Sequence, residues 1–183
     1  EITSLERIQR AATRLDLLVR DVLAYSKISQ GQISLQRVDL ETLVADIIHE
    51  QFETAEKCIK VESPLHTVVG HEGYLTQAIG NLLSNALKFV APGTTPSVHI
   101  RTERLGTGIR LSVIDKGIGI KPEHYGRIFK MFRRVYSEKD FEGTGIGLCI
   151  VKKAVSRMGG QTGFKSELGK GTTFWFDLKD MNS

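Results

Sequence analysis

Two asparagines and a lysine recur at helical spacing in the otherwise apolar stretch from Gln77 to Phe89. Asparagine is a poor helix former, so helix stability does not explain Asn81 and Asn85. At about 100° per residue, both project within one arc together with Lys88. The opposite side of this helix carries apolar residues suited to a core: Leu75, Ile79, Leu82, Leu83 and Ala86. Amide oxygens suit Mg²⁺ and an ammonium group suits phosphate oxygens, so this face is either half of a metal-nucleotide site or a solvated surface.

A carboxylate followed by glycines stands further along the chain, in Asp115-Lys-Gly117-Ile-Gly119-Ile120. It comes directly after an alternating apolar stretch, residues 109–114, which predicts a strand. A carboxylate at a strand end can accept a hydrogen bond from an exocyclic amine such as that of adenine. The glycines allow a ligand to approach the backbone closely.

Two more glycine clusters follow, Gly143-Thr144-Gly145-Ile146-Gly147-Leu148 and Gly169-Lys-Gly171-Thr172. The first leads into a helical pattern over residues 149–158, and free N–H groups at a helix N-terminus attract anions. The second opens a predicted final strand. Each cluster alone is a weak signal, but the ordered set favours the nucleotide interpretation of the asparagine face.

This order of motifs resembles the catalytic ATP-binding domain of sensor histidine kinases, over roughly residues 39–179. The segment 127–134, Arg-Ile-Phe-Lys-Met-Phe-Arg-Arg, and residues 135–142 after it resemble the lid that covers the triphosphate in this family. The amino-acid sequence of this segment resembles that of phytochrome-like kinases. The resemblance implies ATP and Mg²⁺ as cofactors. It also implies an α/β two-layer sandwich of the Bergerat type, in which a mixed, mostly antiparallel sheet and three helices follow a long N-terminal helix.

The resemblance also assigns roles to individual residues. Asp115 would bind the adenine amino group with support from Thr172 through water, and Asn85 would ligate Mg²⁺. Asn81, Lys88 and Arg134 would be the catalytic residues that face the phosphates. The remaining expected contacts to the nucleotide are Phe89, Gly117, Gly119, Ile120, Ile128, Gly143, Thr144, Gly145, Ile146, Gly147 and Leu148. Two residues depart from the family pattern: Arg133 replaces a frequent tyrosine, and His71 replaces a usual aspartate.

Asn81 bears on the type of reaction. Related ATPases have a glutamate at this position that can activate water, whereas an amide cannot take a proton at neutral pH. Phosphoryl transfer to a separate nucleophile needs mainly positioning and charge neutralisation. A protein histidine kinase is therefore favoured. A hydrolase of the same GHKL superfamily and a non-catalytic, nucleotide-gated dimerisation scaffold are the alternatives.

The N-terminal segment has an apolar stripe at steps of three and four residues, typical of a helix packed in a bundle: Leu5, Ile8, Ala12, Leu15, Val19 and Val22. It resembles the second helix of the kinase dimerisation hairpin, whose first helix carries the phosphorylated histidine. We therefore expect a fragment, with residues 1–30 as part of the dimerisation unit and residues 31–183 as the catalytic domain. A homodimer of the intact protein and a response regulator receiver domain are the implied partners.

Composition excludes some other classes. The 183-residue chain has a formal net charge of +4, but its basic residues are dispersed among acidic ones and form no stripe for nucleic acid. No apolar run is long enough to span a bilayer, so we expect a cytoplasmic domain without membrane contact. Cys58 and Cys149 fit no paired motif and are expected to be small buried hydrophobes.

The helices and strands that would position these residues are predicted from hydrophobic periodicity and from capping and helix-breaking residues. We expect helices at 2–29, 40–57 with Asp39 as its cap, 71–90, 122–128 and 146–158. Strands are expected near 58–62, 66–69, 97–105, 108–115, 161–166 and 172–178, and residues 34–38 are a further candidate for an edge strand. The lid, residues 129–145, has too few apolar residues for a core of its own and is expected to be partly disordered without nucleotide.

Overall fold

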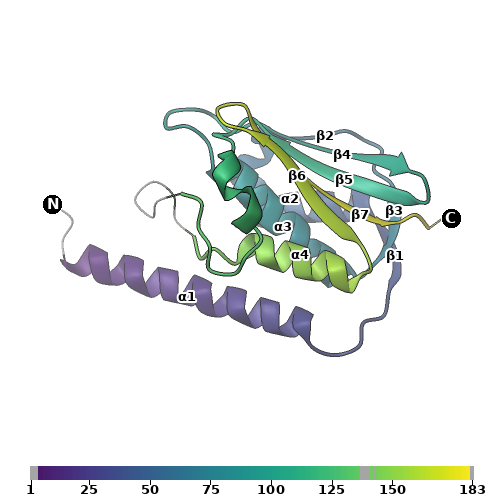
Figure 1. Ribbon diagram of the computed structural model, residues 1–183, viewed down its shortest axis with the longest axis horizontal. Helices are drawn as coiled ribbons and strands as arrows, with labels where there is room; N and C mark the ends of the chain where they lie inside the picture. Colours follow the sequence, from purple (N-terminus) through teal and green to yellow (C-terminus); the bar gives the residue numbers. More distant parts are fainter. Residues whose placement is uncertain (1–3, 137–140, 142, 182–183) are drawn as a thin grey trace.

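The computed structural model describes residues 4–136, 141 and 143–181 (Figure 1). Its α-helices are α1 (Ser4–Ser29), α2 (Leu40–Phe52), α3 (Glu72–Lys88) and α4 (Gly147–Arg157). Its strands are β1 (Gln36–Asp39), β2 (Ile59–Val61), β3 (Thr67–Gly70), β4 (Val98–Leu105), β5 (Gly108–Asp115), β6 (Gln161–Glu167) and β7 (Gly171–Lys179). Two 3₁₀ helices span Glu53–Cys58 and Pro122–Arg127.

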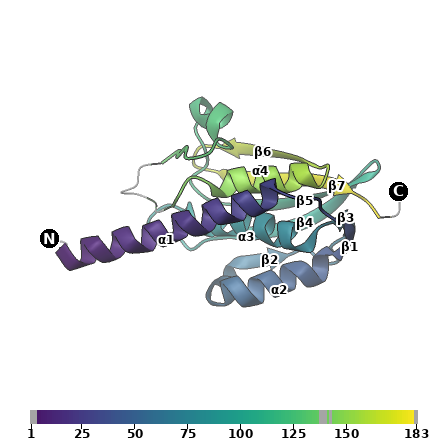
Figure 2. The ribbon, with the colours of Figure 1, turned by 90° about the horizontal axis from the view of Figure 1, so that it is seen from below.

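A five-stranded sheet in the order β2-β4-β5-β7-β6 forms one layer of the molecule. The β2–β4 pair is parallel and the other three pairs are antiparallel. Helices α2, α3 and α4 cover one face of this sheet, and α1 runs outside them (Figures 1 and 2). The predicted two-layer α/β sandwich with a preceding helix is therefore confirmed.

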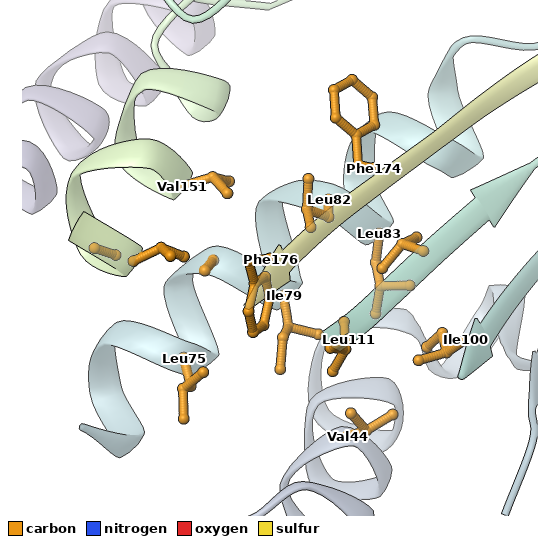
Figure 3. Close-up of a cluster of buried hydrophobic side chains, with 14 of the residues drawn as sticks. Val44, Leu75, Ile79, Leu82, Leu83, Ile100, Leu111, Val151, Phe174 and Phe176 are labelled. Carbon is orange, nitrogen blue, oxygen red and sulfur yellow. The ribbon is translucent and has the colours of Figure 1, made fainter. Parts of the chain in front are cut away.

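The core lies between α3 and the centre of the sheet. Leu75, Ile79, Leu82 and Leu83 of α3 are all at most 1% exposed. Figure 3 shows Ile79 beside Phe176 and Leu111 of the sheet. This is the apolar face that the sequence predicts, because residues three and four apart lie on one side of a helix. Burying that face leaves the asparagine side of α3 free to line a site.

Strands β1 and β3 form a separate two-stranded antiparallel sheet, with Val38 opposite Val68. The predicted edge strand at 34–38 thus begins two residues later and ends one residue later, at Gln36–Asp39. Val38 and Val68 are both buried, which fixes the register, because a slip by one residue would turn each to solvent.

Helix boundaries show where local signals were sufficient. Asp39 caps α2 as predicted, and its carboxylate accepts from the backbone N–H of Glu41 at 2.9 Å. The predicted helix 40–57 is wrong beyond Phe52, where the chain tightens into the 3₁₀ helix Glu53–Cys58. The predicted helix at 122–128 is likewise a 3₁₀ helix. Both cysteines are free and only half-buried, so the expectation of full burial was wrong.

Helix α1 has one docked end and one exposed end. Ile28, near its C-terminus, is buried, whereas Leu5, Ile8 and Leu15 remain more than 60% exposed. Helix α1 packs against α4, as Figure 2 shows. Within the described residues, no helix combines the length and hydropathy needed to cross a bilayer.

Candidate functional site: a cavity between α3, β5 and the glycine loop

A cavity of about 400 Å³ opens where the C-terminal half of α3 meets the end of β5 and the loop before α4. Fifteen of the residues expected to contact nucleotide line this one cavity: Asn81, Asn85, Lys88, Phe89, Asp115, Gly119, Ile120, Ile128, Arg134, Gly143, Thr144, Gly145, Gly147, Leu148 and Thr172. They come from five separate stretches of the chain. The fold therefore gathers residues that are up to 91 positions apart, from Asn81 to Thr172.

Asp115 ends β5 and lines the cavity. Its Oδ1 accepts from the backbone N–H of Gly117 at 2.8 Å and from that of Thr172 at 3.0 Å. Burial raises the pKa of the Asp115 carboxyl above its ordinary value, although these two backbone hydrogen bonds act to lower it. One oxygen is thus held by the backbone, and Oδ2 is left for a ligand that donates a hydrogen bond.

The polar face of α3 lines the same cavity. Asn81 donates through Nδ2 to the carbonyl of Gln77 at 2.8 Å, which fixes its carboxamide along the helix. Its Oδ1 lies against Gly147, where an added Cβ would come within 2.6 Å of it. Among the described residues, the Asn85 carboxamide has no side-chain hydrogen bond, so its oxygen is available to a ligand.

Lys88 follows on the same face, in a mostly buried position. Burial, followed by the charge of Arg134, lowers the pKa of the Lys88 ammonium below its ordinary value, and the carboxylate of Asp21 raises it. Its Nζ lies 4.3 Å from the centroid of the Phe89 ring. Lys88 and Arg134 thus bring two cationic groups to this part of the cavity, next to the Asp21 carboxylate.

The glycine loop at residues 143–147 leads into α4. Ile146 precedes the first turn of α4, and no side chain caps that end. Its uncapped N–H groups and helix dipole are suited to an anion. Gly143 and Gly145 both have positive φ, 154° and 75°, so this loop conformation depends on glycine.

Three aromatic rings form a wall beside Asp115. The ring centroid of Phe89 lies 5.5 Å from that of Tyr136 and 5.1 Å from that of Phe141. The Tyr136 hydroxyl donates to the carbonyl of Gly119. Aromatic rings of this kind offer apolar faces against which a nucleobase can pack.

Two expected contact residues do not line the cavity. Ile146 is fully buried in the core, because it is the anchor from which α4 begins. Gly117 packs instead against the end of α3, where a Cβ would lie 2.2 Å from the carbonyl oxygen of Phe89. Both residues therefore support neighbouring lining residues and do not line the cavity themselves.

Other lining residues were absent from the sequence-based set: Leu17, Asp21, Ser84, Arg133, Val135, Tyr136, Phe141 and Phe174. The aromatic composition of the predicted lid was the available signal for Tyr136 and Phe141. Nothing local to Leu17 or Asp21 indicated them, because their place depends on how α1 docks. The lid, residues 129–145, was predicted to be partly disordered without nucleotide, and residues 137–140 and 142 of it lie outside the described residues.

His71 shows how one departure from the family pattern is accommodated. It is the N-cap of α3, and its Nδ1 accepts from the backbone N–H of Tyr74 at 3.3 Å. An aspartate would accept the same bond, so the imidazole replaces its capping role. The other departure, Arg133, lines the cavity with an exposed side chain.

Comparison with known proteins agrees with this geometry. Residues 70–182 match the family described as histidine kinase-, DNA gyrase B- and HSP90-like ATPase. Cyanobacterial phytochrome A from Nostoc sp. (strain PCC 7120) is 36% identical over 166 residues, which make up 90% of this chain and 22% of that protein. The signal transduction histidine-protein kinase BarA from Escherichia coli (strain K12) is 32% identical over 192 residues, 97% of this chain and 21% of that protein.

A solved structure gives the same result in three dimensions. The full-length ShkA structure in complex with AMPPNP aligns with a TM-score of 0.72 and 34% identity, over 97% of this chain and 39% of that one. The chain spans about a fifth of the length of the curated relatives described above. Motifs, fold and cavity agree with these matches, and the chain belongs to the histidine kinase-, DNA gyrase B- and HSP90-like ATPase family.

Proposed function

We propose that this chain is the ATP-binding catalytic part of a sensor histidine kinase and transfers the γ-phosphoryl group of ATP to a histidine on another segment. The observation that carries the proposal is the arrangement of Asp115 and Asn85 in one cavity. A buried carboxylate and an aromatic wall line this cavity together with an unengaged carboxamide and the ammonium group of Lys88. These groups match a molecule with a hydrogen-bond-donating base and an anionic tail.

Asp115 selects the base in this proposal. Its Oδ2 accepts from the adenine amino group while Oδ1 stays bonded to the N–H groups of Gly117 and Thr172. The Thr172 hydroxyl lies 2.8 Å from that of Ser166, which fixes it beside Asp115. Ile120, Ile128 and Leu148 supply apolar contacts to the base and ribose.

The donor set near the phosphates fits Mg²⁺. Magnesium prefers oxygen ligands and keeps several waters, and it is commonly held by one or two protein oxygens together with substrate phosphates. The Asn85 amide oxygen is such a ligand, with no side-chain hydrogen bond to compete for it among the described residues. When bound, the ion would neutralise phosphate charge during transfer.

Transfer to an external nucleophile is favoured over hydrolysis by Asn81. Its Nδ2 is bonded to the carbonyl of Gln77, and its free Oδ1 belongs to an amide that takes no proton. Lys88 and Arg134 supply positive charge to the transferred group, and the N–H groups of the glycine loop supply hydrogen bonds. The phosphoacceptor histidine, the homodimer through α1, a receiver domain as recipient and a cytoplasmic location belong to the proposal for the intact protein.

Calorimetric titration with ADP and with a non-hydrolysable ATP analogue tests the proposal, in Mg²⁺ and in EDTA. Binding that Mg²⁺ strengthens is the expected result, and absence of binding to either nucleotide would refute the proposal. Asn85→Ala should remove most of the Mg²⁺ dependence while leaving binding in EDTA unchanged. Gln32→Ala, which removes a carboxamide from an exposed loop, is the matched control.

A further inference from the structure

Helix α1 contributes two residues to the wall of the cavity. Leu17 and Asp21, four residues apart on one face of α1, line it together with Asn81 and Lys88. Helix α1 precedes the matched family segment, residues 70–182, by more than forty positions. The cavity is therefore built partly by an element outside that segment.

Asp21 makes a direct contact with the glycine loop. The Thr144 hydroxyl donates to Oδ2 of Asp21, and the same hydroxyl oxygen accepts from the backbone N–H of Ile146 at 3.3 Å. Asp21 also acts on Lys88, since its carboxylate is the charge that raises the pKa of that ammonium. A carboxylate of the protein itself thus contacts the glycine loop and acts on Lys88, and the proposed function gives both that loop and Lys88 to phosphate.

The docking of α1 depends on contacts away from the cavity. Ile28 is 2% exposed, and its carbonyl accepts from the Tyr74 hydroxyl at 3.4 Å. Just beyond α1, the Arg157 guanidinium donates to the carbonyl of Gly31. These contacts hold the C-terminal end of α1, and Asp21 lies two turns earlier on the same helix.

We propose that Asp21 is an internal competitor for the polyphosphate of the nucleotide, so that docked α1 and bound nucleotide weaken one another. The identity of the ligand rests on the proposed function. A polyphosphate at Lys88 and Thr144 would meet the Asp21 carboxylate as a like charge in a half-buried site. The contact between α1 and the loop must then loosen, or the nucleotide must bind less tightly.

Competition of this kind is reciprocal. If the docking of α1 lowers the affinity for nucleotide by some factor, bound nucleotide lowers the equilibrium constant for docking of α1 by the same factor. The effect should be larger for the ATP analogue than for ADP, because the added phosphate brings more negative charge. Nucleotide binding would then free α1 to change its position relative to the catalytic domain.

The test measures affinity for the ATP analogue by calorimetry at low salt in wild type, Asp21→Asn, Asp16→Asn and Ile28→Ala. Asp16 is the matched control, since it lies on the same helix with an exposed side chain paired to Arg20. Asp21→Asn should bind about five- to tenfold more tightly, a typical coupling between sites, and Asp16→Asn should equal wild type. Ile28→Ala weakens docking without touching the cavity and should also bind more tightly.

Hydrogen exchange supplies the reciprocal measurement. Amides of α1 between Leu17 and Ile28 should exchange faster when the analogue is added to wild type. Affinity of Asp21→Asn within twofold of wild type, weaker binding by Asp21→Asn, or unchanged exchange in α1 would each overturn the competition.

The outcomes also separate this inference from the proposed function. Equal nucleotide binding by wild type and Asp21→Asn overturns the inference alone. Binding by neither protein overturns both, because removing the carboxylate then opens no site. Binding by Asp21→Asn alone supports both.

Discussion

Replacing Asp115 with asparagine changes one atom, Oδ2, in the part of the cavity to which we assign the base. The new side chain keeps the oxygen that accepts from the N–H groups of Gly117 and Thr172, at 2.8 and 3.0 Å in the wild type. The second oxygen becomes an amino group, which presents a donor to the donor of adenine. The fold is preserved while the recognition pattern is inverted.

The expected loss follows from the charge and burial of the carboxylate. A hydrogen bond to a charged partner contributes about 1.5–3 kcal/mol, and a buried donor left without an acceptor adds to the penalty. At 1.4 kcal/mol per factor of ten, ADP affinity should fall by about 10- to 150-fold.

Guanine nucleotide provides a second measurement that simple destabilisation would not produce. Guanine carries an acceptor, O6, where adenine carries its amino group. Asp115→Asn should therefore lose preference for ADP over GDP. Calorimetry with both nucleotides measures this, with Asp46→Asn, an exposed change on α2, as the control for removing one charge. ADP affinity within twofold of wild type, or an unchanged preference for ADP, would refute the assignment of Asp115 to the base.

Three further predictions concern Lys88, the turn after β5 and acid stability. Lys88→Met should raise the free energy of unfolding by about 1 kcal/mol, because it removes a poorly solvated charge. The same change should weaken ATP binding more than adenosine binding, and equal weakening for both ligands would contradict the assignment of Lys88 to the phosphates. Gly117→Ala should cost about 2 kcal/mol or more in urea unfolding, because its Cβ would meet the Phe89 carbonyl, whereas Gly126→Ala, with open space around it, should be near neutral. The raised pKa of Asp115 means that the folded state holds the extra proton between its unfolded and folded pKa values, so stability falls as pH rises through that interval. Asp115→Asn should lack this part of the fall in urea unfolding measured at a series of acidic pH values, and parallel curves for the two proteins would contradict it.

Local signals in the sequence predicted most helices and strands, because hydrophobic periodicity and capping or helix-breaking residues act over a few positions. The alternation before Asp115 and the apolar spacing from Leu75 to Ala86 gave a strand and a helix at the correct places. The end of α2 was missed, because nothing in residues 53–57 breaks a helical pattern, and the switch to a 3₁₀ helix is a tertiary effect.

The residues of the candidate site also fall into those that local sequence signals indicated and those that only the tertiary structure brings to the cavity. Residues inside the ordered motifs, such as Asn85 and Thr172, were found because glycine and amide side chains are conspicuous at those positions. Asp21 was not found, because an acidic residue on an amphipathic helix is ordinarily solvated, and only the docking of α1 brings it to Thr144. Ile146 was assigned to the ligand by its place in a motif, whereas its side chain belongs to the core.

The junction at Phe89 gives the cavity a fixed length. Its backbone N–H donates to the carbonyl of Asn85, and its carbonyl accepts from Ile118 at 2.9 Å, which ties the last turn of α3 to the turn after β5. The span between Asp115 and Asn85 is thus held by main-chain bonds, which a substitution disturbs when its new side chain meets the backbone, as at Gly117. We expect the cavity to select ligands by the separation between the group that bonds Asp115 and the group that reaches Asn85, so a molecule with the same base and charge at a different separation should bind more weakly.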